Sequence, residues 1–214
     1  LTIDEVIQHY TEKAVQKAYE LNNAKRVTVV AMDPKTGDIL SMASKPDYDP
    51  NAIELIWESV INDSSSSVLL NRATQGLYPP GSTFKIITSL EYIRENPDTY
   101  QNYFYQCSGR FSLGEDVINC YHGTVHGGED FTKSFAKSCN ASFANIGMSL
   151  DRNKFHDTLS DLLFNEALPV SFAYSQSKVM VDESTSDSDV MQACIGQGMD
   201  QITPLHLNMK KQIS

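Results

Sequence analysis

A serine and a lysine three residues apart are the side chains in this sequence best placed for covalent chemistry. Ser82 and Lys85 lie in residues 78–85, YPPGSTFK. Residues three apart share one face of a helix, so their hydroxyl and amine can meet if a helix begins at or just before Ser82. A lysine can act as the base for a serine when burial or nearby positive charge lowers its pKa. The pair therefore predicts a nucleophilic serine with a lysine base.

The pattern Ser-x-x-Lys occurs three times, so the residues around it decide between the copies. The other two are Ser134/Lys137 and Ser175/Lys178. Only the Ser82 copy follows Pro-Pro-Gly and leads into an apolar stripe, which predicts a helix packed against a core. The stripe consists of Ile86, Ile87, Leu90 and Ile93. A serine that only caps the helix is the alternative interpretation of Ser82.

A second polar group, Ser138-Cys139-Asn140, lies where one expected helix ends and another begins. The first expected helix is capped by Asp130 or Thr132, and the second covers residues 141–150. The expected inner face of the second is Phe143, Ile146, Gly147 and Leu150. Side chains at such a junction can point into a cleft, although a capping role is the alternative.

The elements that must position these groups can be read from periodicity and turn residues. We expect a helix from Thr2 to about Leu21 with a capping box of Thr2 and Glu5, and a β-hairpin from residues 26–32 and 39–43. A short helix around Trp57, a surface loop over residues 62–67, and helices near 155–163 and after Thr203 complete the expectation.

Composition limits the class of protein. The 214 residues are 41% hydrophobic, which allows a sizeable core, and the net charge of −10 argues against nucleic acid or an anionic membrane surface as the main partner. No apolar run has the length of a membrane span, no signal peptide is visible, and the first residue is Leu1. We expect an excised piece of a longer protein, with any membrane anchor upstream.

The cysteines leave two interpretations open. Cys107 and Cys120 flank a segment that predicts a hairpin, so a local disulfide between them is one interpretation, and reduced thiols, including those of Cys139 and Cys194, are the other. A zinc site from Cys107, Cys120, His122 and His126 has suitable residue types. Its spacing fits poorly, because Cys-x-x-Cys is absent and glycines interrupt the histidine pair, so we favour the disulfide or free thiols.

The order of these groups resembles the transpeptidase domain of penicillin-binding proteins. Pro-Pro-Gly-Ser82 with Lys85 comes first, then Ser138 with Asn140, then Gly-Gln-Gly at residues 196–198 and Thr-Pro at 203–204. Residues 29–51 and 71–76 are similar to the family's opening hairpin and its approach to the nucleophile. The likeness runs from about Val27 to Leu207, and it is closer to class B, the monofunctional branch.

The resemblance implies a mixed α/β (α+β) fold similar to serine β-lactamases and transpeptidases, with an antiparallel sheet flanked by helices and an all-helical subdomain. In these terms residues 1–214 are a partial transpeptidase domain: residues 1–50 form an N-terminal helix and hairpin, residues 51–205 a mainly helical part with both motifs, and residues 206–214 a truncated helix. The family's third motif, a Lys-Thr/Ser-Gly strand, is expected beyond the last residue. Lys35-Thr36-Gly37 has the same residue types but lies in the opening hairpin turn, far upstream of the nucleophile, where the resemblance implies that such a sequence serves the turn.

The implied activity is peptidoglycan D,D-transpeptidation. Ser82 would be the acylated nucleophile, Lys85 its base, Ser138 a proton relay and Asn140 a donor to the substrate's peptide carbonyl. Implied partners are stem peptides, β-lactam antibiotics and other cell-wall synthesis proteins, at the extracytoplasmic face of the bacterial membrane; no cofactor is implied. A D,D-carboxypeptidase, a β-lactamase-like hydrolase, and a non-catalytic β-lactam sensor or cell-wall assembly module stay open as alternatives.

Overall fold

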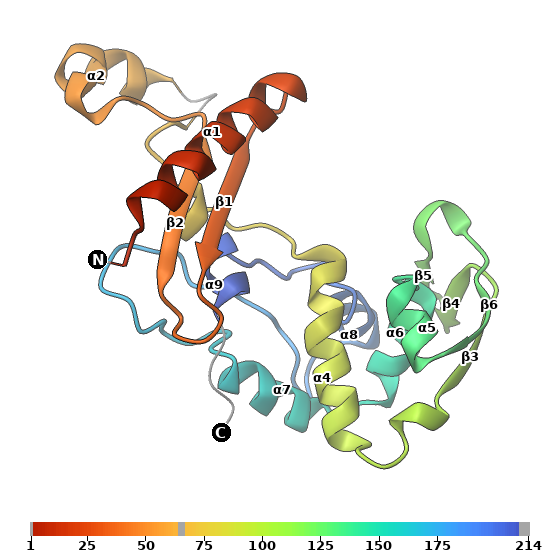
Figure 1. The fold of residues 1–214 in the computed structure, drawn as a ribbon. Coiled ribbons are helices and arrows are strands. Elements are labelled where there is room, and N and C mark those ends of the chain that lie inside the picture. Colours follow the sequence, from red (N-terminus) through yellow and green to blue (C-terminus); the bar gives the residue numbers. More distant parts are fainter. Residues whose placement is uncertain (1, 64–66, 210–214) are drawn as a thin grey trace. The chain divides into compact units, whose positions relative to one another are not determined.

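The computed structural model describes residues 2–63 and 67–209, and these fall into two compact units. The first unit contains the described parts of residues 1–78, 167–177 and 202–214, and the second contains residues 79–166 and 178–201 (Figure 1). The chain therefore leaves the first unit and returns to it twice. The division expected from the sequence, at residues 50 and 205, stays a prediction. The expected loop at residues 62–67 lies partly outside the described residues.

The first unit is built on the expected β-hairpin. Strand β1 (Val27–Met32) pairs antiparallel with β2 (Ile39–Lys45), and helix α1 (Glu5–Leu21) packs on this hairpin. Figure 1 shows α1 lying along both strands. The short helices α3 (Arg72–Gln75) and α9 (Pro204–Asn208) contact β1, while α2 (Ile53–Asn62) is the short helix expected around Trp57.

The start of α1 differs from the expected capping box. The cap is Asp4, whose Oδ1 accepts a hydrogen bond from the Ile7 N–H at 2.9 Å. The Thr2 hydroxyl instead donates to the Ile39 carbonyl oxygen at 2.8 Å, and the Asp4 N–H donates to Leu40. The capping box was wrong because the first residues pair with the hairpin, which places Asp4, a better cap than threonine, at the helix start.

The second unit is mainly helical, with two short antiparallel ladders. Its helices are α4 (Lys85–Glu95), α5 (Phe131–Ala136), α6 (Asn140–Ser149), α7 (Arg152–Asp161) and α8 (Asp187–Ala193). The ladders are β3 (Phe104–Cys107) with β6 (Gly127–Asp130), and β4 (Arg110–Leu113) with β5 (Asp116–Asn119). Single 3₁₀ turns cover Pro50–Ala52 in the first unit and Gly81–Phe84, Tyr100–Asn102 and Tyr121–Gly123 in the second.

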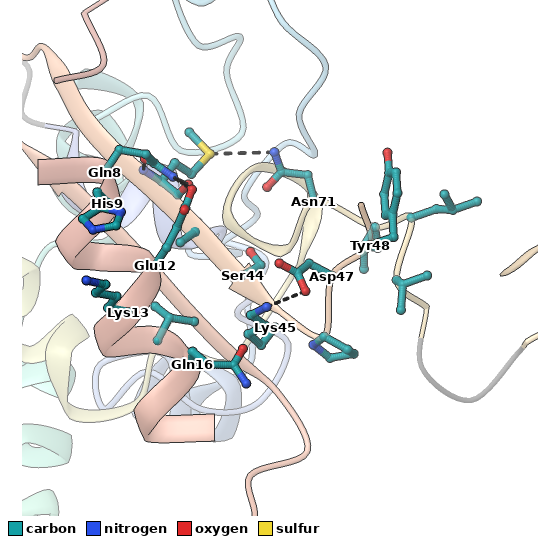
Figure 2. A pocket seen from close by; sticks show the side chains of 17 residues that line it. Gln8, His9, Glu12, Lys13, Gln16, Ser44, Lys45, Asp47, Tyr48 and Asn71 are labelled. Atoms are coloured by element: carbon teal, nitrogen blue, oxygen red, sulfur yellow. Dashed lines mark hydrogen bonds and ion pairs between the residues drawn. The ribbon is translucent and has the colours of Figure 1, made fainter. Parts of the chain in front are cut away.

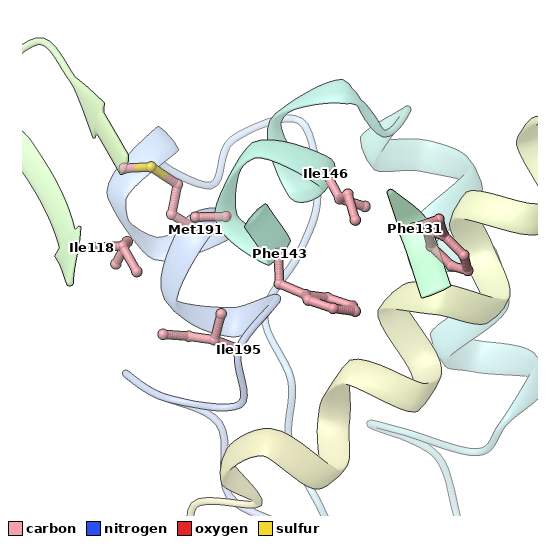
Figure 3. Close-up of a cluster of buried hydrophobic side chains, with 7 residues drawn as sticks. Ile118, Phe131, Phe143, Ile146, Met191 and Ile195 are labelled. Carbon is pink, nitrogen blue, oxygen red and sulfur yellow. The ribbon is translucent and has the colours of Figure 1, made fainter. Parts of the chain in front are cut away.

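Helix α6 forms the centre of the second unit. It packs on α4, α8 and the β4–β5 hairpin. Its predicted inner face is confirmed, since Phe143, Ile146, Gly147 and Leu150 are all buried. Figure 3 shows Phe143 and Ile146 pointing into a cluster with residues of α5, β5 and α8. The cluster consists of Ile118, Phe131, Phe143, Ala144, Ile146, Met191 and Ile195. A Cβ at Gly147 would overlap the Cys194 thiol, so glycine lets α6 and α8 approach closely.

The buried face of α4 is more polar than expected. Ile86, the first residue of the predicted stripe, is 61% exposed, whereas Lys85, Thr88 and Glu91 are buried. Thr88 donates to the Cys194 carbonyl oxygen at 2.9 Å, and Glu91 accepts from the Thr158 hydroxyl of α7. The prediction was wrong at Ile86 because polar groups with buried partners take the inner face of this helix.

The mixed α/β class with antiparallel strands is confirmed. Among the described residues the strands form three separate two-stranded ladders, β1–β2, β3–β6 and β4–β5. Within the same residues no helix is both long enough and apolar enough to span a membrane.

Candidate active site

The turn before Ser82 is fixed by its backbone and by a second loop. Gly81 has φ +57°, and its N–H donates to the Gly196 carbonyl oxygen at 2.8 Å. Gly196 itself has φ +70°, and a Cβ there would overlap the Gly81 backbone. Both glycines are therefore required by geometry, one by conformation and the other also by the close approach of two backbones. Gly81–Phe84 then form a 3₁₀ turn that continues directly into α4.

Lys85 is the point at which both predicted motifs meet. Its Nζ lies 3.4 Å from the Ser82 Oγ and 3.1 Å from the Ser138 Oγ. The ammonium also donates to the Ser138 carbonyl oxygen and to the Asn140 Oδ1, each at 2.7 Å. The structure thus brings together all four residues that the sequence singled out, from positions more than 50 residues apart.

Burial changes the acid–base behaviour of this lysine. The Lys85 side chain is 1% exposed, and its Nζ lies 5.4 Å from the centre of the Phe143 ring. Desolvation lowers the pKa of Lys85 from 10.5 to about 8, against an opposing effect of the Cys139 and Cys120 thiols. A measurable fraction of the side chain is therefore a neutral amine near neutral pH, and its lone pair can accept a proton.

Ser138 and Asn140 are held at the junction of α5 and α6. Ser138 has φ +52°, a left-handed conformation that costs a residue with a Cβ about 1–2 kcal/mol. Asn140 begins α6 and donates from Nδ2 to the Asn119 carbonyl oxygen at 3.1 Å. Because the amide has two N–H donors, the second remains able to bind a ligand carbonyl. The residue between them, Cys139, caps α6.

Ser82, Ser138 and Asn140 line a cavity of about 460 Å³ within the second unit. Its lining is Ser82, Tyr121, His126, Lys137, Ser138, Asn140, Ile195 and Gln197. The sequence marked Gln197 only as part of Gly-Gln-Gly and His126 only as a possible metal ligand. Tyr121 carried no signal, because a single aromatic residue in a loop matches no pattern.

The other two Ser-x-x-Lys copies lie in different surroundings. The Ser134 hydroxyl is buried and accepts from the Ser142 hydroxyl at 2.7 Å, while Lys137 is exposed. Ser175 lies outside the described helices, and its hydroxyl donates to the Gln75 carbonyl oxygen at 2.9 Å. Among the described residues, the Ser82 copy alone has its lysine ammonium hydrogen-bonded to Ser138 and Asn140, and the role of Ser82 as nucleophile stays a prediction.

A second cavity, of about 570 Å³, lies in the first unit between α1 and β2 (Figure 2). Two pairs of its polar side chains bind each other: Gln8 donates to Glu12 at 2.7 Å, and Lys45 forms an ion pair with Asp47 at 2.6 Å. None of the four predicted site residues is among those lining it. We therefore place the candidate chemistry in the smaller cavity.

Three of the four residues considered for a zinc site from the sequence do come together, and Cys139 takes the place expected for His122. Cys107, Cys120 and His126 meet Cys139, and their ligand atoms all lie within 4.8 Å of one another. His122 is exposed and is not part of the group. The four cysteines are free thiols in this structure. The sequence carried no indication of Cys139, because it lies 13 residues beyond His126, outside the loop-rich stretch that holds the other three.

Comparison with known proteins identifies the family of this chain. Residues 27–209 match the family described as penicillin binding protein transpeptidase domain. The chain is 30% identical over 223 residues to the peptidoglycan D,D-transpeptidase PbpA of Mycolicibacterium smegmatis, covering 95% of this chain and 44% of the relative.

Solved structures give the same result. The penicillin G acyl-enzyme complex of penicillin-binding protein A from M. tuberculosis matches with a TM-score of 0.83 at 25% identity, over 96% of this chain and 49% of the solved one. Penicillin-binding protein PBP2, in its complex with MreC from Helicobacter pylori, matches with a TM-score of 0.76 at 25% identity. This match covers 90% of this chain and 38% of the solved one. The chain thus spans half or less of the length of these proteins, and it belongs to the penicillin-binding protein transpeptidase domain family.

Proposed function

We propose that this chain carries the acylating serine of a peptidoglycan D,D-transpeptidase of class B type. The substrate would be the D-alanyl-D-alanine end of a peptidoglycan stem peptide. Support comes from the M. smegmatis relative, which is named a peptidoglycan D,D-transpeptidase, and from the M. tuberculosis structure, which is an acyl-enzyme with penicillin G. The observation in this chain that carries the proposal is the contact of one buried amine, Lys85, with Ser82, Ser138 and Asn140.

In the proposed acylation, the Ser82 Oγ attacks the carbonyl carbon of the terminal amide. The neutral Lys85 amine, 3.4 Å away, takes the hydroxyl proton as the new C–O bond forms. The amide C–N bond then breaks, and D-alanine leaves with a proton on its nitrogen. The Ser138 hydroxyl, 3.1 Å from Nζ, is placed to pass that proton from Lys85 to the leaving nitrogen.

Asn140 would orient the substrate, and the acyl group would then pass to a second strand. The free N–H of its amide can donate to a peptide carbonyl of the stem peptide, while its Oδ1 holds Lys85. An amine of a neighbouring stem peptide would attack the ester carbonyl, giving a new amide and returning the proton to the Ser82 oxygen. Water as the acceptor would give the D,D-carboxypeptidase reaction instead.

We further propose the setting of this activity. A protein that acts on peptidoglycan works at the extracytoplasmic face of the bacterial membrane, and β-lactams would acylate the same serine. The PBP2 relative from H. pylori was solved in complex with MreC, which supports a cell-wall synthesis protein as a partner.

Intact-mass measurement after incubation with penicillin G tests the proposal directly. The experiment uses the full-length gene product that contains this chain. Because the nitrogen freed by β-lactam ring opening stays attached to the acyl group, we expect the mass of the protein to rise by the mass of one whole penicillin G molecule. The Ser82→Ala variant should gain nothing, and Ser175→Ala, which changes another Ser-x-x-Lys copy, should be acylated like the unaltered protein. Absence of an adduct, or an adduct that persists in Ser82→Ala, would refute the assignment.

A second measurement separates transfer from hydrolysis. A stem-peptide substrate is incubated with and without an amine acceptor such as a D-amino acid, and the products are identified by mass. Transpeptidation predicts an exchanged product that grows with acceptor concentration. Release of D-alanine alone at every acceptor concentration would identify a carboxypeptidase.

A further inference from the structure

The cavity that contains Ser82 has a basic lining in an acidic protein. Among the described residues, those that line it include no acidic side chain, and its basic members are His126 and Lys137. The chain as a whole has 27 acidic and 17 basic residues, not counting histidine, and a net charge of −10. A concave site with charge of one sign focuses its field on ligands of the opposite sign. The lining therefore favours an anionic group on the ligand.

The ammonium of Lys137 is available to bind such a group. Lys137 is exposed, and no hydrogen bond or ion pair joins its ammonium to any other residue that the structure describes. The other two lysines of this region are occupied, Lys85 by the second motif and Lys133 by the Gly128 carbonyl oxygen. The His126 Nδ1 lies 3.5 Å from a cysteine thiol. Lys137 is thus the lining cation that is left for a ligand.

The backbone of Lys137 is fixed, so its side chain leaves the turn from a defined point. Lys137 ends α5, and Ser138 after it has the left-handed φ of +52°. The Ser138 N–H donates to the Phe135 carbonyl oxygen at 2.9 Å, and the Cys139 N–H donates to that of Ser134 at 3.0 Å. These two bonds form a Schellman motif, which satisfies carbonyl groups at the end of a helix. The Lys137 ammonium is therefore not needed to cap α5.

The same turn also presents Asn140 to the cavity. Cys139 is fully buried, and its neighbours on the turn are the ones that line the cavity, namely Lys137, Ser138 and Asn140. In the proposed reaction, Asn140 donates to a peptide carbonyl of the acyl-donor strand. Because Lys137 belongs to the same turn, a side chain of that strand is the nearest source of an anion for it. The C-terminal carboxylate of the leaving D-alanine is the alternative source.

We propose that the Lys137 ammonium binds a carboxylate on the acyl-donor side of the scissile amide. The site then favours stem peptides with a free carboxylate on the side chain before D-alanyl-D-alanine over peptides with a neutral amide there. Tyr121 and Ile195 supply apolar parts of the lining, against which the rest of such a side chain can pack. The identity of the peptide rests on the proposed function, whereas the binding of a carboxylate does not.

Two penicillins that differ by one carboxylate test this specificity. Carbenicillin is penicillin G with a carboxylate added next to its side-chain carbonyl, so its extra anion lies on the acyl side. The full-length gene product and its Lys137→Gln variant are acylated with each compound, and second-order rate constants are measured by intact mass. We expect the ratio of the carbenicillin constant to the penicillin G constant to fall about two- to fivefold in Lys137→Gln, as for an exposed ion pair. Lys137→Glu should lower this ratio further.

Salt and saturation give two more readouts of the same contact. At 1 M salt, where the Debye length is about 3 Å, the difference in ratio between the unaltered protein and Lys137→Gln should shrink. The loss in Lys137→Gln should lie in the carbenicillin concentration that gives half the maximal rate, with the rate at saturation retained, because the contact is the same before and during acylation. A loss confined to the rate at saturation would contradict a binding role.

Lys154→Gln is the matched control. Lys154 is an exposed lysine of the same unit that does not line the cavity, so its removal changes the net charge equally and should leave the ratio unchanged. An unchanged ratio in Lys137→Gln, or an equal fall in Lys154→Gln, would overturn the proposal. Equal losses with both penicillins, at an unchanged melting temperature, would place Lys137 at the ring carboxylate that both compounds share and would refute the assignment to the acyl side.

Peptide binding separates this proposal from the proposed function. The Ser82→Ala variant is titrated, with ligand-observed NMR as the readout, with two peptides that end in D-alanyl-D-alanine and differ only in a carboxylate or a carboxamide on the preceding side chain. We expect the carboxylate peptide to bind about two- to fivefold more tightly, and this preference to vanish when Lys137→Gln is added. Equal binding of the two peptides, or no binding of either, would refute the subsite.

The two sets of results fail in different ways. If neither penicillin acylates the unaltered protein but the carboxylate peptide is preferred, the proposed function fails and the carboxylate subsite stands. If penicillin G acylates Ser82 but the two peptides bind equally, the proposed function stands and the role of Lys137 is refuted.

Discussion

Lys85 is bound more closely by Ser138 than by Ser82, the serine on its own helical turn. Its Nζ is 2.7 Å from the Ser138 carbonyl oxygen and 3.1 Å from the Ser138 hydroxyl, but 3.4 Å from the Ser82 hydroxyl. Ser138 therefore sets the position of the Lys85 ammonium, and in the proposed reaction Ser82 would present the nucleophile to it. On that proposal, acylation would depend on the protonation state of Lys85 and on the geometry of residue 138.

The rate of acylation should rise with pH until Lys85 is neutral. Desolvation lowers its pKa from 10.5 to about 8, and only the neutral amine can accept the serine proton. Below pH 8 the rate should grow about tenfold per pH unit and then level off above it. The second-order rate constant with a chromogenic β-lactam, measured from pH 6 to 10, checks this. A flat profile, or one that falls over this range, would exclude Lys85 as the base.

Replacing Asn140 by aspartate should move that profile to higher pH. The Asn140 Oδ1 lies 2.7 Å from the Lys85 Nζ, so Asn140→Asp places a carboxylate against the ammonium and raises the lysine pKa by about 1–3 units. At pH 7 acylation should fall about ten- to a thousand-fold, with partial recovery above pH 9. The control is Asn102→Asp, at an exposed position of the same unit, which should leave the profile unchanged. An equal loss for Asn140→Asp at every pH would point to a lost substrate contact instead.

Gly196→Ala should disturb the turn that presents Ser82. The substitution places a Cβ in a left-handed conformation and against the Gly81 backbone. Strain of about 1–2 kcal/mol from the conformation adds to about 1–3 kcal/mol from overpacking. Gly114→Ala is the matched control, because Gly114 has φ +60° and a Cβ there meets nothing within 4 Å. Urea unfolding should show the larger loss for Gly196→Ala, and only this variant should be acylated slowly. Equal losses of stability in the two variants would show that the contact with Gly81 has no effect.

Local sequence signals were sufficient for most elements, and they singled out four residues that the structure places together. The inner face of α6 follows from its apolar periodicity, and the selection of Ser82 among three copies follows from Pro-Pro-Gly and the helix after it. These features depend on residues close together in the sequence.

Features that depend on distant partners could not be predicted. The buried face of α4 is polar because Thr88 finds the Cys194 carbonyl and Glu91 finds Thr158, and neither partner is visible from the helix itself. In the same way, Cys139 joins Cys107 and Cys120 only because α6 packs on the β4–β5 hairpin. Periodicity cannot indicate which side chain will meet a partner 20 or 100 residues away.

Ser138 should show a conflict between stability and activity. Its φ of +52° costs about 1–2 kcal/mol for any residue with a Cβ, and glycine removes most of this cost. Glycine also gains about 0.4–1 kcal/mol of entropy in the unfolded chain, which offsets part of the benefit. We expect Ser138→Gly to be more stable than Ser138→Ala by about 1 kcal/mol in urea unfolding.

Both Ser138 variants should nevertheless be acylated slowly, because each lacks the hydroxyl that we propose passes the proton to the leaving nitrogen. Loss of a positioned proton-transfer group typically costs about 10²–10⁴ in rate. Ser134→Ala is the control, since that buried hydroxyl contacts Ser142 and not Lys85. If Ser138→Gly were acylated at the unaltered rate, the hydroxyl would have no role in proton transfer. If Ser138→Ala were the more stable variant, the left-handed backbone at this position would not be strained, and residue 138 would be retained for its chemistry alone.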